Sequence, residues 1–400
     1  MGKNEEWLER DKNALASVLP RCSDIVAMRG KGTWLYDVEW NKYLDFTSGI
    51  AANSTGHCHP KIVDAIKLQA DTLIHTSVTT HHRMNIRLAE RLGEICTFFE
   101  EPQVFFCNSG AEAVDGALKL AQVVTGKSGV VAFRGAFHGR TVGATSLTTA
   151  KNKYRDPYIA GLLSGIRFVD YGSEVFTGVY PGWIGMMIVE PILGEGGYVV
   201  PPEGWLQYLR EYCDENNILL VFDEVQTGIG RTGHWFAAET FGVTPDVILF
   251  AKGIASGLPL GGIIAPRLLL DQWPEGTHGS TFGGNPVSCA AALATLEILE
   301  PLLPRVKEKG YWALEKLEQW SPRGIGYMIG IPCINKQRAI NVQDFCRENG
   351  LLVLLCGPEE DTIRLIPPLT ASDEEWEIAM DILDRALNKC LIDDILKYSW

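Results

Sequence analysis

Four groups that could take part in chemistry follow short apolar runs in the middle of the chain. The first is the turn Ser109-Gly110-Ala111, which comes after the run VFFC and opens a segment of helical periodicity. Backbone N–H groups at a helix N-terminus bind anions such as phosphate. The same turn would also serve as an ordinary helix cap, with Ser109 as the cap and Glu112 at the third helical position. Taken alone, the turn favours the plain cap.

The second group is the stretch Phe137-His138-Gly139-Arg140-Thr141, which follows the apolar run VVAF. The ring of Phe137 could stack on a planar ligand, and the guanidinium of Arg140 could bind a carboxylate. A partly buried phenylalanine beside a surface arginine would explain the same residues. By itself, the stretch favours this simpler interpretation.

The third and fourth groups are Asp223 and Lys252, at the ends of the apolar runs ILLVF and DVILFA. An aspartate at the end of a buried strand needs a partner, because an unpaired buried charge is costly. A protonated pyridine nitrogen would be such a partner, and this pairing makes the ring a better electron acceptor. Burial of Lys252 would lower its pKa and favour the neutral amine that forms an imine. The alternatives are a capping aspartate and a lysine that extends to the surface.

These groups fall on a regular alternation of apolar strands and helices, which predicts the elements that position them. Continuous apolar strands separated by helices indicate a mostly parallel sheet covered on both faces. Ligands bind at the carboxyl ends of such strands. The expected fold class is therefore α/β, with a large domain over residues 47–285. The expected strands are 104–107, 130–133, 166–170, 186–191, 218–224, 246–251 and 261–265, and the expected helices are 60–75, 84–98, 111–125 and 204–216.

A smaller α+β domain is expected over residues 286–400, where helical periodicity returns after Pro286. Residues 33–46 alternate apolar and polar side chains on either side of a polar turn, which predicts a hairpin. We assign this N-terminal segment, residues 1–46, to the small domain. The other expected elements are helices 301–319, 336–349 and 373–390 and strands 327–332, 351–356 and 363–368.

The composition restricts the class of function. A formal net charge of −13 and a pI near 5.2 oppose binding to nucleic acid or to an anionic membrane surface. The ten cysteines form no CxxC pair and several lie in apolar runs, which is typical of reduced core thiols. The N-terminus shows no apolar signal region, and no apolar run is long enough to span a bilayer. We therefore expect a cytoplasmic protein.

Two short motifs suggest other ligands, but their context argues against them. Residues 228–233 fit the pattern GxGxxG of a dinucleotide-binding loop. Such a loop should follow its strand directly and open a helix, and this one does neither. The two histidines and one cysteine of residues 56–60 lack a second pair of ligands at a suitable spacing. We expect no metal site.

The order of the motifs along the chain is more specific than any one of them. In this order the chain resembles the class III (ω-type) aminotransferases of pyridoxal-phosphate (PLP) fold type I, and most closely those for 4-aminobutyrate and acetylornithine. The resemblance covers nearly the whole chain, from residue 43 to residue 370. The matching stretches are NSGAEA (108–113), FHGRT (137–141), VEPILGEGG (189–197), VFDEVQTGIGRTG (221–233), FAKGIASGLPLGG (250–262) and GSTFGGNP (279–286).

The resemblance implies a role for each matching residue. Lys252 would carry PLP as a Schiff base and move the substrate proton, and Asp223 would pair with the ring nitrogen. Thr281 would reach the phosphate of the neighbouring subunit, which implies a homodimer with shared active sites. The implied cofactor-binding residues are Ser109, Gly110, Ala111, Phe137, His138, Glu190, Asp223, Val225, Gln226, Lys252 and Thr281. The implied substrate-binding residues are Ile50, Arg140, Glu195, Ser280 and Arg364.

The substrate-binding set favours a 4-aminobutyrate-like ω-amino acid as donor and 2-oxoglutarate or pyruvate as acceptor. In the family, a pair such as Glu195 and Arg364 lets one pocket accept both an ω-amine and an α-carboxylate. An acetylornithine or ornithine aminotransferase is the alternative, and an amino-acid racemase or epimerase on the same scaffold is a further one. Residues 78–85 and 331–340 depart from the family pattern, which leaves the substrate open. The presence of both Lys252 and Asp223 argues against a non-catalytic relative.

Overall fold

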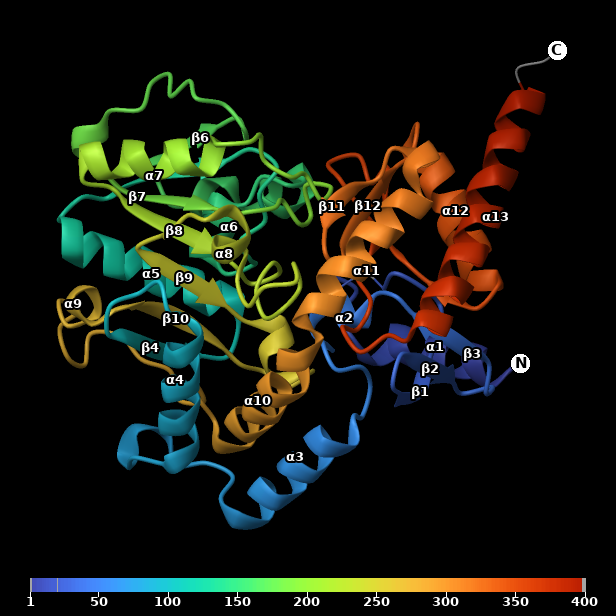
Figure 1. The fold of residues 1–400 in the computed structure, drawn as a ribbon, viewed down its shortest axis with the longest axis horizontal. Helices are drawn as coiled ribbons and strands as arrows, with labels where there is room; N and C mark the ends of the chain where they lie inside the picture. The colour runs from blue at the N-terminus through green and yellow to red at the C-terminus, as the bar shows by residue number, and fades with distance from the viewer. Residues whose placement is uncertain (1, 20, 398–400) are drawn as a thin grey trace.

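The chain folds around one large central sheet with two smaller sheets beside it (Figure 1). The computed structural model describes residues 2–19 and 21–397. The central sheet has seven strands in the order β4-β10-β9-β8-β7-β5-β6. Only β10 runs antiparallel to its neighbours, and the other pairs are parallel. The prediction of a mostly parallel sheet is therefore confirmed. Its strands are β4 (Pro102–Cys107), β5 (Gly129–Phe133), β6 (Ile166–Val169), β7 (Ile184–Val189), β8 (Leu219–Asp223), β9 (Val247–Phe250) and β10 (Gly261–Pro266).

Both faces of the central sheet are covered, which explains why its strands are apolar throughout. Val221 of β8 packs in one core cluster, together with α5 (Gly110–Thr125) and α6 (Val142–Leu147). Phe222 faces the opposite cluster, which contains residues of α4 (Arg83–Ile95) and α7 (Trp205–Asn216). Successive side chains of a strand point to opposite faces, so each strand contributes to both cores.

The two smaller sheets join the beginning of the chain to its end. Strand β13 pairs in parallel with β3, so the N-terminal hairpin is extended by a segment from the C-terminal third. The expected strand over 351–356 is divided at Val353, because its two halves join different sheets. One sheet contains β1 (Ala27–Lys31), β2 (Trp34–Asp37), β3 (Lys42–Asp45) and β13 (Leu351–Leu352), and the other contains β11 (Arg323–Ile325), β12 (Met328–Pro332), β15 (Thr362–Leu365) and β14 (Leu354–Cys356). The domain bounds at 47 and 286 stay a prediction.

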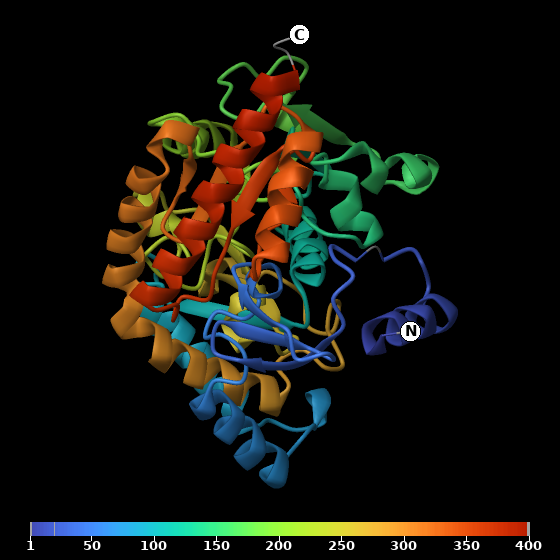
Figure 2. The same cartoon turned by 90° about the vertical axis from the view of Figure 1, so that its right-hand side faces the viewer.

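The remaining helices surround these sheets, except for the first. Helix α1, which the sequence did not predict, has no buried residue and lies apart from the body of the molecule (Figure 2). The helical stretch Pro286–Lys316 is long and apolar enough to cross a membrane, yet half of its most apolar window is buried within the protein, as in a core helix. The helices not yet given are α1 (Lys3–Ala14), α2 (Ser48–Ala51), α3 (Pro60–Thr72), α8 (Ala237–Phe241), α9 (Arg267–Leu270), α10 (Pro286–Leu299), α11 (Leu303–Lys316), α12 (Lys336–Glu348) and α13 (Asp373–Lys397).

Candidate functional site

A cavity of about 440 Å³ lies at the carboxyl ends of the parallel strands of the central sheet. Strands β4, β5, β7, β8 and β9 all end at this edge, and each is followed by at least one residue of the cavity wall. The structure thus brings together most of the predicted site, which the sequence spreads over more than a hundred residues. Those that line the cavity are Ser109, Gly110, Ala111, Phe137, His138, Arg140, Glu190, Glu195, Asp223, Val225, Gln226 and Lys252.

The N-terminus of α5 points backbone N–H groups toward the cavity while its cap is also formed. Ser109 Oγ accepts the N–H of Glu112 at 3.2 Å, as the plain cap predicts. The first N–H groups of a helix have no partner within it, so those of Gly110 and Ala111 remain for a ligand. A Cβ atom added to Gly110 would lie 2.8 Å from both methyl groups of Val225. The close approach therefore requires glycine and leaves an anion-binding backbone turn.

Asp223 is held in place by a buried histidine. His138 Nδ1 donates to Asp223 Oδ2 at 2.7 Å, and the N–H of Val225 donates to Asp223 Oδ1 at 3.1 Å. The backbone N–H of His138 is itself bound to Thr148 Oγ1 at 2.9 Å. Both side chains of the pair are buried. His138, predicted to contact the cofactor, therefore positions the carboxylate of Asp223.

Glu190 connects two loops of the cavity wall. Its carboxylate accepts the N–H of Phe137 at 2.7 Å and the N–H of Gly194 at 3.0 Å. Burial raises the pKa of Glu190 to about 7, and the negative charge of Asp223 adds to this while His138 opposes it. The arrangement fixes the backbone on which the Phe137 ring is mounted.

Lys252 follows β9 and begins a 3-10 turn, Lys252–Ala255. Its φ of +47° lies in the left-handed region, which costs a non-glycine residue about 1–2 kcal/mol and recurs at functional sites. Burial lowers the pKa of the Lys252 amine, although Asp223 and Glu195 partly oppose this shift. A lowered pKa favours the neutral amine, which is the nucleophilic form. Lys252 therefore combines a strained backbone with a desolvated amine, as expected of a constrained reactive lysine.

Arg140 lies on the rim of the cavity against an aromatic residue that the sequence did not single out. Its guanidinium lies 3.9 Å from the centre of the Tyr154 ring, and this ring meets Phe137 edge-on at 5.6 Å. Arg140 is exposed and has no ion pair among the described residues. The guanidinium is therefore oriented by a cation–π contact and available for a carboxylate.

Glu195 and Arg364 form the predicted pair. Arg364 Nη1 donates to Glu195 Oε1 at 2.5 Å, and the Arg364 side chain is 3% exposed. Burial alone would raise the pKa of Glu195, but the charge of Arg364 outweighs burial and the pKa is lowered. Burial alone would lower the pKa of Arg364, but the charge of Glu195 outweighs burial and the pKa is raised. Both groups are therefore charged, with Glu195 in the cavity wall and Arg364, on β15, behind it.

Ile50 is not among the residues that line the cavity of this subunit, and its role toward a substrate stays a prediction. It belongs to α2, where φ lies between +41° and +66° for all four residues, so the turn is left-handed. Ser48 Oγ donates to the carbonyl of Ile366 at 2.6 Å and helps to hold this strained backbone. The turn leaves Ile50 exposed and brings Ala52 to the cavity instead. A left-handed run of mostly non-glycine residues gives no sequence signal that would have revealed it.

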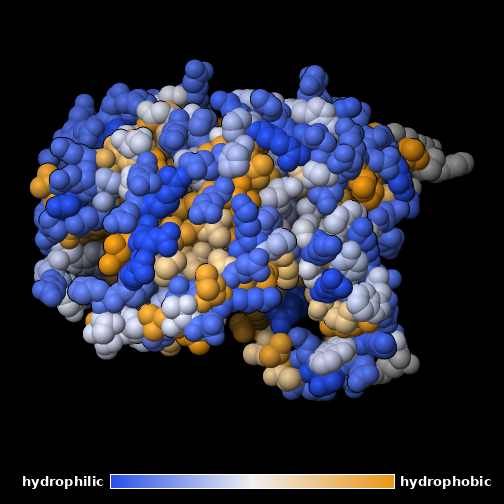
Figure 3. Space-filling model, turned by 60° about the horizontal axis from the view of Figure 1, so that its bottom comes forward, coloured by the Kyte–Doolittle hydropathy of each residue, from blue (hydrophilic) through white to orange (hydrophobic). Residues whose placement is uncertain are grey.

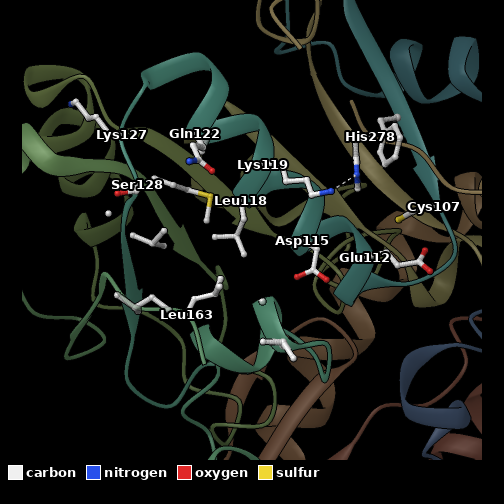
Figure 4. A pocket seen from close by; sticks show the side chains of 18 of the residues that line it. Cys107, Glu112, Asp115, Leu118, Lys119, Gln122, Lys127, Ser128, Leu163 and His278 are labelled. Carbon is white, nitrogen blue, oxygen red and sulfur yellow. Dashed lines mark hydrogen bonds between the residues drawn. The ribbon is translucent and has the colours of Figure 1, made fainter. Parts of the chain in front are cut away.

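Ser280 and Thr281 also lie outside this cavity. Asn108 Nδ2 donates to Ser280 Oγ at 2.9 Å, which places Ser280 behind the N-terminus of α5. It lines a second cavity of about 660 Å³ (Figure 4), where Lys119 approaches His278 at 3.2 Å. Thr281 is exposed at the surface. The structure therefore does not support a substrate contact for Ser280 within its own subunit, and the role of Thr281 toward a partner stays a prediction.

The two motifs that suggested other ligands make contacts within the protein. The loop 228–233 packs against α11, where an added Cβ on Gly233 would lie 2.7 Å from the side chain of Lys307. His57 Nε2 lies 2.7 Å from Asp45 Oδ2, so this histidine has a carboxylate partner. Among residues 2–19 and 21–397 there is no group of three or more histidine, cysteine or acidic side chains that could hold a metal ion.

Known proteins resemble this chain over almost its whole length. The family model for aminotransferase class-III matches residues 18–387. An acetylornithine aminotransferase of Methanosarcina acetivorans is 42% identical over 95% of this chain and 95% of its own length. An acetylornithine aminotransferase of Methanosarcina mazei is 44% identical over 90% of this chain and 91% of its own length. The ornithine aminotransferase of Toxoplasma gondii, whose crystal structure has partial occupancy of PLP at the active site, superposes with a TM-score of 0.90 at 28% identity. That superposition covers 98% of this chain and 95% of the other.

These similarities confirm the predicted fold class, enzyme class and cofactor. The central sheet with its adjoining smaller sheets is the PLP fold type I architecture of these neighbours. Pyridoxal phosphate is the cofactor of the family. The chain belongs to the class-III aminotransferases.

Proposed function

We propose that this enzyme transfers the terminal amino group of acetylornithine to 2-oxoglutarate, with PLP as its cofactor. The observation that carries the choice of donor is the identity of 42–44% to acetylornithine aminotransferases over at least nine-tenths of both chains. It favours the alternative donor over the 4-aminobutyrate-like substrate that the sequence first suggested. The relatives compared above are all aminotransferases, which favours amino transfer over racemisation.

The residues of the cavity fit PLP in three respects. The α5 N-terminus offers unpaired N–H groups to a phosphate, in a place where a side chain on Gly110 would not fit. Gln226 Oε1 and His138 Nε2 are buried without a hydrogen-bond partner among the described residues. Such buried polar atoms are costly unless a ligand satisfies them. The carboxylate of Asp223 completes the set, since it suits a protonated ring nitrogen.

The protein groups have separable tasks in the proposed reaction. When bound, PLP supplies a reactive aldehyde carbon and an electron-accepting ring. The neutral amine of Lys252 takes a proton from the substrate carbon that carries the amino group and returns it to a different carbon. Its lowered pKa favours the neutral form that this step needs. Asp223, oriented by His138, would pair with the ring nitrogen and keep it protonated. Phe137, whose backbone is fixed by Glu190 and whose side chain lines the cavity, would pack against the ring and exclude water from it.

The charged groups on the rim suit a substrate with one distant carboxylate. Arg140 is exposed and unpaired among the described residues, so it can bind the carboxylate that lies far from the reacting amine. Glu195 neutralises Arg364, so the aliphatic arm of acetylornithine meets a paired charge. With 2-oxoglutarate, a carboxylate lies beside the reacting carbon and would bind Arg364 in place of Glu195.

An apolar surface around the loop that contains Thr281 supports the proposed homodimer. Phe282 and Ile74 are 60% and 61% exposed, and the rings of Phe282 and His75 lie 5.0 Å apart. Asn285 Nδ2 donates to the carbonyl of Ile74 at 2.9 Å, so the two exposed segments form one surface. The lower face of the molecule carries apolar side chains beside a hollow (Figure 3). Contiguous exposed apolar surface is typical of an interface between protein chains, and a second copy would place Thr281 near a neighbouring site.

The cysteines agree with a reducing environment. Among the described residues the cysteines form no disulfide, and most of them are buried in the core. Burial raises the pKa of Cys107 and Cys213 to about 12, which makes them unreactive near neutral pH. The cytoplasmic location stays a prediction.

A panel of amino donors tests the proposed substrate. Purified enzyme loaded with PLP is mixed with acetylornithine, ornithine, 4-aminobutyrate or β-alanine, each with 2-oxoglutarate or pyruvate. We expect the highest kcat/KM for acetylornithine with 2-oxoglutarate. A higher kcat/KM for 4-aminobutyrate would restore the first interpretation of the sequence. Inversion of a chiral amino acid without any oxo acid would indicate a racemase.

A further inference from the structure

Lys151 occupies an unusual position between two carboxylates at the edge of the active site. Its side chain is 8% exposed. The ammonium lies 2.9 Å from Glu360 Oε1 and 3.8 Å from Glu195 Oε2. No sequence motif pointed to this residue, and the reaction described above does not use it.

The two oxygens of Glu195 face two different cations. Oε1 accepts from Arg364, while Oε2 is the oxygen nearest to Lys151. Burial alone would lower the pKa of Lys151, but the hydrogen bond to Glu360 and the charge of Glu195 outweigh it and the pKa is raised. Lys151 is therefore a permanent cation about one ångström beyond hydrogen-bond distance from a carboxylate that already has a partner.

Glu360 fixes the position of Lys151. It accepts from Lys151, Lys153 and Lys336 at 2.9, 2.8 and 2.7 Å. Lys153 and Lys336 are mostly exposed, whereas Lys151 points inward. The loop that contains Glu360 is also joined to the backbone of Glu195, because the N–H of Gly357 donates to the Glu195 carbonyl at 2.8 Å. The cluster thus holds one buried ammonium beside the Glu195 carboxylate.

We propose that Lys151 is a positioning residue that receives the Glu195 carboxylate when a substrate α-carboxylate takes its place on Arg364. The inference rests on the proposed function, because it requires substrates with and without a carboxylate on the reacting carbon. It specifies which group stabilises the buried Glu195 carboxylate after a substrate carboxylate has displaced it from Arg364.

Charge balance is the physical reason. In the structure Glu195 pairs with Arg364 and Lys151 pairs with Glu360, and acetylornithine, which has no carboxylate on the reacting carbon, would leave both pairs in place. When a substrate carboxylate binds Arg364, Glu195 becomes a second anion next to it in a nearly buried place. Unpaired buried charges are strongly unfavourable. Closing the 3.8 Å gap to Lys151 returns a cation to Glu195, and Lys151 is then shared between Glu195 and Glu360.

The test compares ligands that differ in this one carboxylate. Lys151→Met keeps the aliphatic stem and removes the charge, and Lys153→Met is the matched control because it loses a bond to Glu360 but lies outside the Glu195 pair. In Lys151→Met we expect the KM for glutamate to rise at least about tenfold. The Kd of 2-oxoglutarate, measured by calorimetry on the PLP-loaded enzyme, should rise by a similar factor. The half-reaction with acetylornithine should change by less than about twofold. Lys153→Met should leave both ligands unchanged, and Lys151→Arg should restore most of the affinity.

A double-mutant cycle separates this role from a general effect on folding. If Lys151 acts through the Glu195 carboxylate, Lys151→Met should have no further effect on 2-oxoglutarate binding in a Glu195→Gln background. Equal losses for both ligands, equal losses in Lys153→Met, or an undiminished loss in the Glu195→Gln background would each overturn the inference, as would an unchanged Kd. Wild-type enzyme that fails to react with acetylornithine refutes the proposed donor instead. The Lys151 comparison is then made between glutamate and the ω-amine that is accepted, and failure to use glutamate at all also overturns it.

Discussion

Removing the charge of Glu195 should reverse the preference of the active site between its two kinds of ligand. The substitution Glu195→Gln keeps an oxygen that can accept the Arg364 hydrogen bond, which is 2.5 Å long in the structure. It leaves the guanidinium of Arg364, with a side chain that is 3% exposed, without a counter-ion until a ligand carboxylate arrives. A ligand with an α-carboxylate would no longer have to displace an anion.

The size of the effect follows from the charges and their surroundings. Two unit charges about 4 Å apart attract by about 4 kcal/mol at an effective dielectric constant of roughly 20. The retained hydrogen bond contributes about 1 kcal/mol, and relaxation of water and of nearby charges reduces the difference further. A net change of about 2 kcal/mol corresponds to about thirtyfold in affinity. We therefore expect 2-oxoglutarate to bind about thirtyfold more tightly and kcat/KM for acetylornithine to fall by a similar factor.

Single-turnover absorbance measurements on the cofactor separate the two half-reactions, and calorimetry gives the Kd of 2-oxoglutarate. Thermal unfolding of the variant serves as the control for folding, since breaking a buried ion pair also destabilises the protein. Weaker binding of 2-oxoglutarate, or a parallel change for both ligands, would refute the reasoning that Glu195 competes with a substrate carboxylate for Arg364.

Three further outcomes are expected. Lys252→Ala should abolish turnover and the covalent label that borohydride leaves on the PLP-loaded wild type, which mass spectrometry detects; a retained label at another residue would contradict the role of Lys252. Gly110→Ala should lower PLP affinity at least about tenfold in a spectral titration, because the added Cβ lies 2.8 Å from the methyl groups of Val225; an unchanged affinity would exclude the phosphate cradle. Burial raises the pKa of Glu190 from 4.5 to about 7, so between these pH values the folded protein keeps a proton that the unfolded chain loses. The free energy of unfolding of the PLP-free enzyme should therefore decrease as the pH rises from about 4.5 to 7. Denaturant titrations of Glu190→Gln should show a smaller decrease.

The sequence predicts the site well where a motif coincides with the end of a parallel strand. Asp223 and Lys252 end the runs that become β8 and β9, and strands that run in the same direction bring such residues to one edge. Gly110 could be anticipated for a similar reason, because it opens the helix after β4. The topology of the sheet therefore converts order along the chain into proximity.

The features that the sequence does not predict depend on contacts between distant segments. Nothing near Lys151 indicates that Glu360 and Glu195 will lie on either side of it. The left-handed turn around Ile50 is held by the carbonyl of Ile366, far along the chain. The pairing of His138 with Asp223 likewise joins the loop after β5 to the end of β8. Local patterns carry no information about such partners.

The division of the strand over 351–356 has the same cause. Six apolar residues in a row predict one strand, because periodicity describes only the local conformation. In the fold, β13 pairs with β3 and β14 pairs with β15, so the run serves two sheets with a break at Val353. Which sheet receives a strand is decided by its neighbours in space.

The pairing of β3 with β13 also has a consequence for folding during synthesis of the chain. The hairpin of β2 and β3 leaves the ribosome early, but its partner strand is made roughly 300 residues later, which takes roughly 15–60 s at 5–20 residues per second. During this time the outer edge of β3 has no partner, and an open strand edge can pair with other chains. Arg364 emerges later still, so the active site cannot assemble before synthesis is nearly complete. The nascent N-terminal hairpin is therefore a segment that a chaperone could protect, and completion of its sheet should depend on how quickly the last quarter of the chain is synthesised.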